Sequence, residues 1–382
     1  MSPTALAFGV LALSGATAKD LGFVLTAQAI PMVLLMPFGG VLADRVPRAL
    51  VVSTTDMILG ALVVAEGALL IMGTATVPLL AVINVGAGLL NALWLPAFPG
   101  LVPAVLGEGD LQRGNAVVGV ASNAGMIVGS ALAGAIVAAF GGGVGIVVDG
   151  VTFLVAGAIV STFRHIAPPA SQPQRTMFRD LRDGWRTFLS LRWLWVMVAA
   201  WAIGNAAFRG GLEVGGPVLM KEAFDGPRTW AVLQTIGAIG FVVGSAVATR
   251  LRPRRPLALY QLLACALPVY MVALAGPAPF LLLALAAFAF GVSLEAAFTI
   301  WTTTMQTHVP RDSLSRASAF DMFGSLAFGP VGLALAGTVI AAFGLRALFI
   351  GCTALTLVAI VVPVLVRDVR ELPWIEPERP SA

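Results

Sequence analysis

The sequence predicts an all-α polytopic membrane protein built from two six-helix halves that run in the same direction. Three observations carry this prediction: an apolar composition, apolar runs of spanning length, and an internal duplication. Hydrophobic residues make up 58% of the 382 residues and charged residues only 11%. Ordinary globular chains carry about 25% charged residues. This chain cannot cover itself with polar surface, so we expect it to lie in a lipid bilayer.

The duplication is clearest in a glycine-bounded segment. The run from Gly129 to Gly141 recurs as the run from Gly332 to Gly344, 203 positions later. Other residues keep the same order in both copies: Gly40 and Arg48 are matched by Gly244 and Arg252, Trp94 by Trp301, and Leu111 and Arg113 by Leu314 and Arg316. Two similar halves in the same direction enclose a path between them, which is the architecture of carriers whose halves move around a central site.

Apolar runs of about twenty residues, the length that a spanning helix needs, recur along the whole chain. Eleven complete spans are predicted, at residues 21–42, 49–73, 77–95, 116–140, 144–163, 194–218, 230–251, 257–275, 280–304, 320–343 and 345–366. The segment 4–13 is too short to cross a hydrocarbon core of about 30 Å. Comparison with the second half predicts a first helix that lacks its cytoplasmic part.

The predicted organisation follows from these spans. Residues 1–163 form the N-terminal half, 164–193 a cytoplasmic linker, 194–366 the C-terminal half and 367–382 a cytoplasmic tail. The second part of the linker reads as an amphipathic helix with Phe178, Leu181, Trp185 and Phe188 on one face. We expect a structural strap along the membrane surface, with a partner-binding helix as the alternative.

Arginine and lysine set the orientation, because cytoplasmic loops carry an excess of them. If the link after residue 42 is cytoplasmic, the opposite face keeps only Lys19, Lys221, Arg228 and Arg346. The net charge of +4 then describes membrane topology, and nucleic-acid binding loses its main support. The Ala-, Gly- and Arg-rich composition favours a bacterial cytoplasmic membrane, with the C-terminus in the cytoplasm.

No enzyme, metal or cofactor chemistry is indicated. Cys265 and Cys352 lie in apolar runs, and His165 and His308 lack metal-ligand spacing. No Gly-rich phosphate loop ending in Lys-Ser or Lys-Thr is present, so nucleotide hydrolysis has no predicted site. Any driving force must come from an ion or substrate gradient.

The link after the second helix carries a candidate conformational switch made of Gly40, Asp44, Arg45 and Arg48. Asp44 stands at the end of one predicted helix and can bridge to Arg48, while Gly40 lets helices approach closely. Such an ion pair can form in one conformation and break in another. The alternative is a static topology anchor made by the two arginines.

This segment, Gly39-Gly40-Val-Leu-Ala-Asp44-Arg45-Val-Pro47-Arg48, resembles the signature loop of the major facilitator superfamily. Further matches extend the resemblance to the branch of enterobactin exporters and macrolide-efflux-like permeases: Pro96-Ala97, Leu101-Val102-Pro103, Asn115-Ala116, Asp149 and Trp301 to Arg316. The resemblance implies transport of a small molecule by alternating access. Ser130 and Ala133 depart from it, because the fifth-helix antiporter motif favours Pro and Gly there.

Small residues recur on one face of two predicted helices, at Gly125, Gly129 and Gly134 and again at Gly332 and Gly337. Close helix packing is the simpler interpretation. The functional interpretation is that these small-residue faces line the seam between the two halves.

Ionisable residues inside the spans are the candidates for mechanism, since each costs roughly 2.5–3.5 kcal/mol at a helix centre unless it is paired or faces water. Six are found: Asp56, Glu66, Asp149, Arg209, Glu213 and Glu295. Arg209 and Glu213 share a helix face beside Gly210-Gly211, where the backbone can open. We take Arg209, Glu213 and Glu295 as the candidate contacts for substrate or protons. A self-neutralising structural pair is the alternative for the first two.

The function predicted from these features is export of a small amphipathic compound by a monomeric secondary transporter in the lipid bilayer, with proton exchange as one driving force. An importer or facilitator of a small metabolite is the alternative within transport. A non-transporting membrane sensor or scaffold is the alternative from another class. Substrate-dependent flux in vesicles separates the three.

Overall fold

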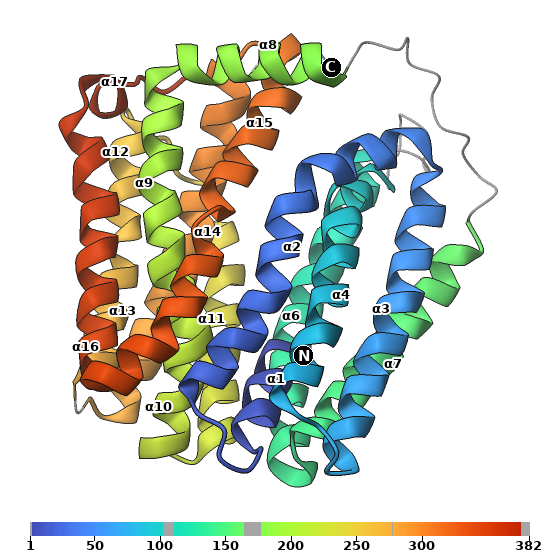
Figure 1. Cartoon of the computed structure of the whole chain (residues 1–382). Coiled ribbons are helices and arrows are strands. Elements are labelled where there is room, and N and C mark those ends of the chain that lie inside the picture. The colour runs from blue at the N-terminus through green and yellow to red at the C-terminus, as the bar shows by residue number, and fades with distance from the viewer. Residues whose placement is uncertain (1, 102–110, 164–176, 277, 376–382) are drawn as a thin grey trace. The chain divides into compact units, whose positions relative to one another are not determined.

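The computed structural model describes residues 2–101, 111–163, 177–276 and 278–375, and within these ranges the secondary structure is helical with no strand (Figure 1). The all-α prediction is confirmed. The first repeat contributes α1 (Ser2–Leu11), α2 (Ala18–Arg45), α3 (Arg48–Ile71), α4 (Val77–Ala97), the 3₁₀ turn Phe98–Gly100, α6 (Leu111–Phe140) and α7 (Gly142–Ser161).

The second repeat contains more interruptions than the first. Its elements are α9 (Arg192–Phe208), a π-helix (Arg209–Gly215), α10 (Gly216–Ala223), α11 (Gly226–Ala248), α12 (Pro256–Ala264), α13 (Ala266–Ala275), α14 (Phe280–His308), α15 (Arg311–Leu326), α16 (Gly329–Leu365) and α17 (Arg367–Arg370). Proline stands at the start of α12 and α16, where its missing N–H and fixed φ suit the first turn of a helix.

Nine helices among the described residues are long and apolar enough to cross a membrane, and a tenth span is obtained if the bent helices Gly184–Ser190 and Arg192–Ala223 count as one. The longest candidate, Ala317–Leu365, has 49 residues, more than twice the roughly 20 that one crossing needs. Gly344 divides it. The predicted spans 320–343 and 345–366 therefore meet at this glycine, and α1 has the ten residues of a helix too short to span.

The duplication is visible in the backbone at the ends of the repeated segments. Gly141 has φ 85° and ψ 168°, and Gly344 has φ 83° and ψ 167°. Positive φ of this kind is accessible to glycine and costly for other residues. Each repeat therefore uses a glycine to turn from one helix into the next at the same position.

By packing, the chain divides into two units. The first comprises Met1–Gln174, Leu212–Thr235 and Leu333–Ala342, and the second comprises Arg175–Gly211, Ile236–Gly332 and Phe343–Ala382. The predicted halves are divided at the boundary between the two sequence repeats, whereas these units are groups of residues that contact one another. The first unit therefore combines the first repeat with parts of α10, α11 and α16.

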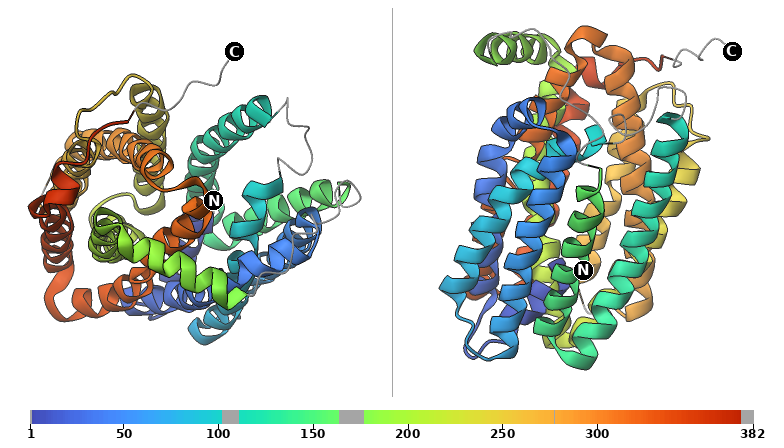
Figure 2. Two further views of the ribbon diagram at one scale, coloured as in Figure 1. Left: turned by 90° about the horizontal axis from the view of Figure 1, so that it is seen from above. Right: turned by 90° about the vertical axis from the view of Figure 1, so that its right-hand side faces the viewer.

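Within the second unit, α8 (Met177–Ser190) is the amphipathic helix of the linker. It bends by 95° into the helix that follows, so it lies across the end of α9 (Figures 1 and 2). Trp185 and Phe188 contact Phe320 of α15, with ring centroids 5.3 and 5.9 Å apart. The side chains of Phe178 and Leu181 lie outside the described residues. The strap predicted from the sequence is thus fastened to α15 by aromatic contacts.

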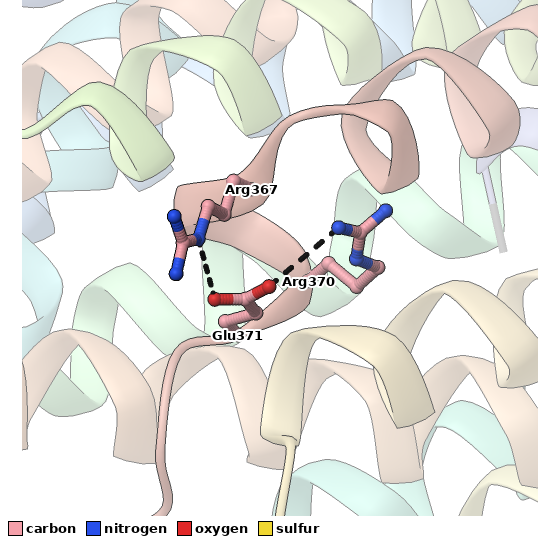
Figure 3. Close-up of polar contacts among 3 residues, drawn as sticks. All are labelled: Arg367, Arg370 and Glu371. Atoms are coloured by element: carbon pink, nitrogen blue, oxygen red, sulfur yellow. Dashed lines mark hydrogen bonds and ion pairs between the residues drawn. The ribbon is translucent and has the colours of Figure 1, made fainter.

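The tail after the last span begins with α17, which carries a small exposed ion-pair group (Figure 3). Arg367 Nε donates to Glu371 Oε2 at 2.7 Å, and Arg370 Nη2 lies 3.6 Å from Glu371 Oε1. The hydrogen bond from Arg367 lowers the pKa of Glu371 below its usual value. The Trp374 amide donates to the Arg254 carbonyl at 3.2 Å, so the tail meets the loop before α12.

Candidate functional site

The predicted switch lies where α2 gives way to α3. Gly40, Asp44 and Arg45 fall in the last turns of α2, and Arg48 begins α3 directly after Pro47. Arg48 is partly buried, while the side chains of the other three lie outside the described residues. The Asp44–Arg48 bridge therefore stays a prediction.

Two glycines of the predicted seam lie where one repeat touches the other within the first unit. A Cβ on Gly134 of α6 would collide with the Cβ of Ala231 on α11. A Cβ on Gly337 of α16 would collide with the backbone of Ala18 and Lys19 at the start of α2. Because Gly134 and Gly337 are 203 positions apart, they are equivalent in the duplication. The contact is reciprocal: the glycine of the first repeat packs against the second repeat, and the equivalent glycine of the second repeat packs against the first.

Neighbouring contacts extend this seam. A Cβ on Gly22 of α2 would lie 2.6 Å from the carbonyl oxygen of Leu333 on α16. The Lys221 ammonium of α10 donates to the carbonyl of Leu11 at the end of α1. Lys221 is one of the few cations that the charge pattern assigns to the outer face.

The other predicted seam glycines lie elsewhere. Gly332 packs against Ala206 of α9, within its own repeat. Gly129 is partly buried. A Cβ on Gly125 would meet nothing within 4 Å, so close helix packing does not require a glycine there in this conformation.

Arg209 and Glu213 both fall in the π-helix Arg209–Gly215, which includes the Gly210-Gly211 step. A π-helix forms i→i+5 hydrogen bonds, so the α-helical argument from a spacing of four does not apply unchanged. Both side chains are partly buried. A Cβ on Gly329 would lie 2.9 Å from Arg209 Cδ, which places this side chain beside the start of α16.

Glu295, the third predicted contact, lies between α14 and α11. The Ser245 hydroxyl donates to Glu295 Oε1 at 3.1 Å. A Cβ on Gly244 would lie 3.0 Å from Glu295 Cβ. The carboxylate is partly buried and sits beside the glycine that matches Gly40 in the duplication.

The remaining predicted acids are buried in the first unit. Asn84 of α4 donates from Nδ2 to Glu66 Oε1 of α3 at 2.6 Å, and both side chains are buried. Asp56 is 5% exposed and lies beside the indole of Trp94, which approaches it without a hydrogen bond of normal geometry. Asp149 of α7 is also buried.

The sequence-based search missed one acid, Asp321 of α15. Trp301 Nε1 donates to Asp321 Oδ2 at 2.9 Å, and the Ser325 hydroxyl donates to Oδ1 at 3.4 Å. Asp321 is the second residue of the predicted span 320–343 and is not one of the six ionisable candidates. In the structure α15 begins at Arg311, ten residues earlier, and a helix rises about 1.5 Å per residue. Asp321 thus lies about 15 Å from the start of α15 and four residues into the candidate membrane span that begins at Ala317. The available signal in the sequence was Trp301, the tryptophan that the second repeat shares with the first.

Aromatic rings from three helices pack against one another around Trp301, the residue that donates to this acid. Trp301 of α14 has ring centroids 5.9 Å from Trp193 of α9 and 6.0 Å from Tyr260 of α12. Tyr260 in turn lies 5.6 Å from Trp201 of α9. We call Trp193, Trp201, Tyr260 and Trp301 the aromatic group of the second unit.

Metal coordination finds no support in the described part of the chain, where no three His, Cys, Asp or Glu side chains gather as a metal site requires. Cys265 and Cys352 are both free thiols.

Comparison with known proteins extends over almost the whole chain. The family model described as Major Facilitator Superfamily matches residues 2–328 and, in a second match, 236–381. The multidrug efflux pump Tap of Mycolicibacterium fortuitum is 27% identical over 391 aligned positions, which cover 97% of this chain and 92% of that protein.

Solved structures share the fold. A bacterial homologue of the human lysosomal transporter Spinster, inward-facing and unoccupied, matches with a TM-score of 0.69 at 16% identity and covers 98% of this chain and 95% of its own. The nucleoside transporter NupG matches with a TM-score of 0.69 at 12% identity, covering 95% and 93%. The chain belongs to the Major Facilitator Superfamily, and it is a transporter and not an enzyme.

Proposed function

We propose that the protein exports a small amphipathic compound by alternating access. The reciprocal contact of Gly134 with Ala231 and of Gly337 with Ala18 supports this proposal most directly. A carrier of two repeats must pack its halves tightly at one end while the other end admits substrate. Small residues allow such packing, and these contacts lie near Lys19 and Lys221, which the charge pattern assigns to the outer face.

Export is favoured over import by the relative that is a multidrug efflux pump over nearly the full length of both chains. The nucleoside transporter NupG shares the fold, so uptake of a polar metabolite is the second candidate. The scarcity of charge in the spans favours an amphipathic substrate over a polar one.

Proton exchange is the proposed driving force, with Glu213 and Glu295 as the candidate carriers. Each is a partly buried carboxylate, and Glu213 belongs to a π-helix, an irregularity frequent at functional sites. Arg209 is the cation nearest to Glu213 in the sequence. We further propose that the chain works as a monomer in the bacterial cytoplasmic membrane, with its C-terminus in the cytoplasm.

Transport in everted membrane vesicles tests these proposals. Cytoplasmic substrate reaches the transporter from outside such vesicles, so an exporter accumulates an amphipathic dye inside them when a proton gradient is applied. An importer accumulates the dye in right-side-out vesicles instead, and a sensor or scaffold produces no flux in either.

Three variants separate the parts of the mechanism. Glu213→Gln or Glu295→Gln at the true coupling position should abolish gradient-driven export and leave downhill flux. If both variants export normally, these carboxylates are structural. Asp44→Asn should slow the cycle at equal membrane abundance, and normal flux would remove the switch hypothesis.

A further inference from the structure

Helix α8 lies at the level where two candidate spans of the second unit begin. It turns by 95° into α9, so it runs across the start of that span (Figures 1 and 2). The rings of Trp185 and Phe188 pack against Phe320 of α15. Phe320 stands three residues after Ala317, where the candidate span of α15 and α16 begins. An amphipathic helix held at this depth lies along the interface between membrane and water.

Two apolar side chains of α8 remain exposed beside this contact. Trp185 is 47% exposed although its ring packs against Phe320, and Leu189 is also 47% exposed. Because residues four apart share a helix face, Trp185 and Leu189 form one apolar row. Tryptophan is enriched at the membrane–water interface, where its apolar ring and its polar N–H are both accommodated. The row therefore suits contact with lipid.

A row of arginines borders the apolar row. Arg182 and Arg186 are exposed, and each stands three residues before a member of the apolar row, which is about 60° around the helix. The buried ring of Phe188 lies on the other side of the apolar row. The acids of α8, Asp180 and Asp183, belong by the same spacing to the side of the helix away from the apolar row. Among the ion pairs of the described side chains, none involves Arg182 or Arg186.

The order around α8 is thus a buried ring, exposed apolar side chains and then exposed cations. This order matches the boundary between acyl chains and phospholipid headgroups. Arginine can lay its apolar stem along the acyl region while its charge stays at the headgroups. Its planar guanidinium binds phosphate through two hydrogen bonds at once. Basic residues near the surface of a bilayer are attracted to lipids with a net negative charge.

We propose that α8 binds anionic phospholipids. The guanidinium groups of Arg182 and Arg186 bind the lipid phosphates, and Trp185 and Leu189 contact the upper part of the acyl chains. A lipid is favoured over a protein partner because α8 lies at the depth where the spans begin, so lipid is the neighbouring phase. The inference concerns the membrane surface and not the substrate, so it goes beyond the proposed transport function.

Native mass spectrometry of the purified full-length chain in detergent tests the surface. Phosphatidylglycerol, which is anionic, is titrated in parallel with phosphatidylcholine of the same acyl chains, which has no net charge. The wild type should bind phosphatidylglycerol more tightly. The double variant Arg182→Gln with Arg186→Gln should bind it at least about tenfold more weakly, because each basic residue at an anionic surface contributes about fivefold. The corresponding double Lys variant keeps the charge and should retain most of the binding.

Hydrogen exchange in lipid nanodiscs localises the effect. The amides of α8 should exchange more slowly in phosphatidylglycerol than in phosphatidylcholine, and this difference should disappear in the double Gln variant. Leu189→Ser should weaken binding of both lipids by roughly threefold, since it removes apolar contact and leaves the charge unchanged.

Arg254→Gln with Arg255→Gln is the matched control. It removes the same charge from two exposed arginines, which lie in the loop before α12 and not along an amphipathic helix. Its affinity for phosphatidylglycerol should stay within about twofold of the wild type, because the lost charge is not beside the apolar row. The melting temperature and the size-exclusion profile show whether each variant is folded. If the double α8 variant aggregates, Arg186→Gln alone carries the test, with an expected loss of about fivefold.

Four results would each overturn the proposal. They are equal binding of the two lipids by the wild type, wild-type affinity in the α8 Gln variants, an equal loss in the loop variant, and unchanged binding in Leu189→Ser. Equal binding of the two lipids would leave an acidic protein as the occupant of the arginine row. These measurements need neither substrate nor gradient, so they do not depend on the direction of transport.

Discussion

Trp94 and Trp301 hold corresponding places in the two repeats, yet the acids beside them come from different helices. In the first repeat the neighbour is Asp56 of α3, buried at 5% exposure, and the Trp94 indole lies beside it without a hydrogen bond of normal geometry. In the second it is Asp321 of α15, which is partly exposed and accepts a 2.9 Å hydrogen bond from Trp301. The second tryptophan makes a well-formed hydrogen bond to its acid, and the first does not.

The duplication explains how this difference arose. Gly40 and Gly244 are 204 positions apart, and the same shift carries Asp56 onto Tyr260. The ring of Tyr260 packs against Trp301, so the second repeat has a phenol where the first has a carboxylate. The 203-position shift of the later segment sets Asp321 opposite Val118. The two repeats share a tryptophan and a glycine turn between helices. They do not share the position of the acid beside that tryptophan.

Substitution of a seam glycine should give the largest effect, because each repeat uses the equivalent glycine to pack closely against the other. Gly134→Leu would drive a side chain into Ala231. We expect loss of dye export and a destabilisation of about 3 kcal/mol, at the upper end for overpacking. Flux in everted vesicles and thermal unfolding in detergent are the measurements. Gly125→Leu on the same helix is the control, since its Cβ meets nothing within 4 Å; equal damage at both positions would contradict the seam.

The tryptophans themselves should give a smaller and unequal effect. Trp301→Phe removes the hydrogen bond to Asp321 and should cost about 2 kcal/mol, as hydrogen bonds to charged groups do. Trp94→Phe removes an N–H that lies beside Asp56 without a well-formed hydrogen bond and should cost less than about 1 kcal/mol. Thermal unfolding of the two variants gives the comparison directly. Equal costs would show that the surroundings of Trp94 and Trp301 are more alike than their hydrogen bonds indicate.

The turn glycines should respond alike, since here the repeats are the same. Gly141→Ala and Gly344→Ala each place a Cβ at a positive φ and should each cost roughly 1–2 kcal/mol. No neighbour lies within 4 Å of either Cβ, so backbone strain is the whole effect. A difference between the two melting temperatures well beyond experimental error would mean that the turns are not equivalent.

The tail should give the smallest effect. Arg367 lowers the pKa of Glu371, so this ion pair contributes stability above the ordinary carboxyl pKa of about 4.3 and loses it as the pH falls through the lowered value. Both side chains are exposed, and exposed pairs contribute little. Glu371→Gln at pH 7 should therefore leave export and the melting temperature unchanged. A clear loss of either would show that the tail takes part in the cycle.

Much of the architecture follows from the sequence alone. Composition and run length determine that the chain is helical and suited to a membrane, because an apolar chain in lipid must satisfy its backbone within helices. The repeated segments predicted the duplication, and the signature loop predicted the superfamily. These signals are local or periodic, so they can be read without knowing which helices touch.

Tertiary structure decided which of the predicted residues meet. Gly125 and Gly134 share one helix and one sequence argument, but only Gly134 faces the other repeat. Asp321 of α15 accepts a hydrogen bond from an indole of α14, a contact that no pattern in the sequence indicates. A contact between helices depends on their rotation and depth, which periodicity does not encode. The sequence therefore determined what the protein is built from, and the packing of the helices decided where its charge can act.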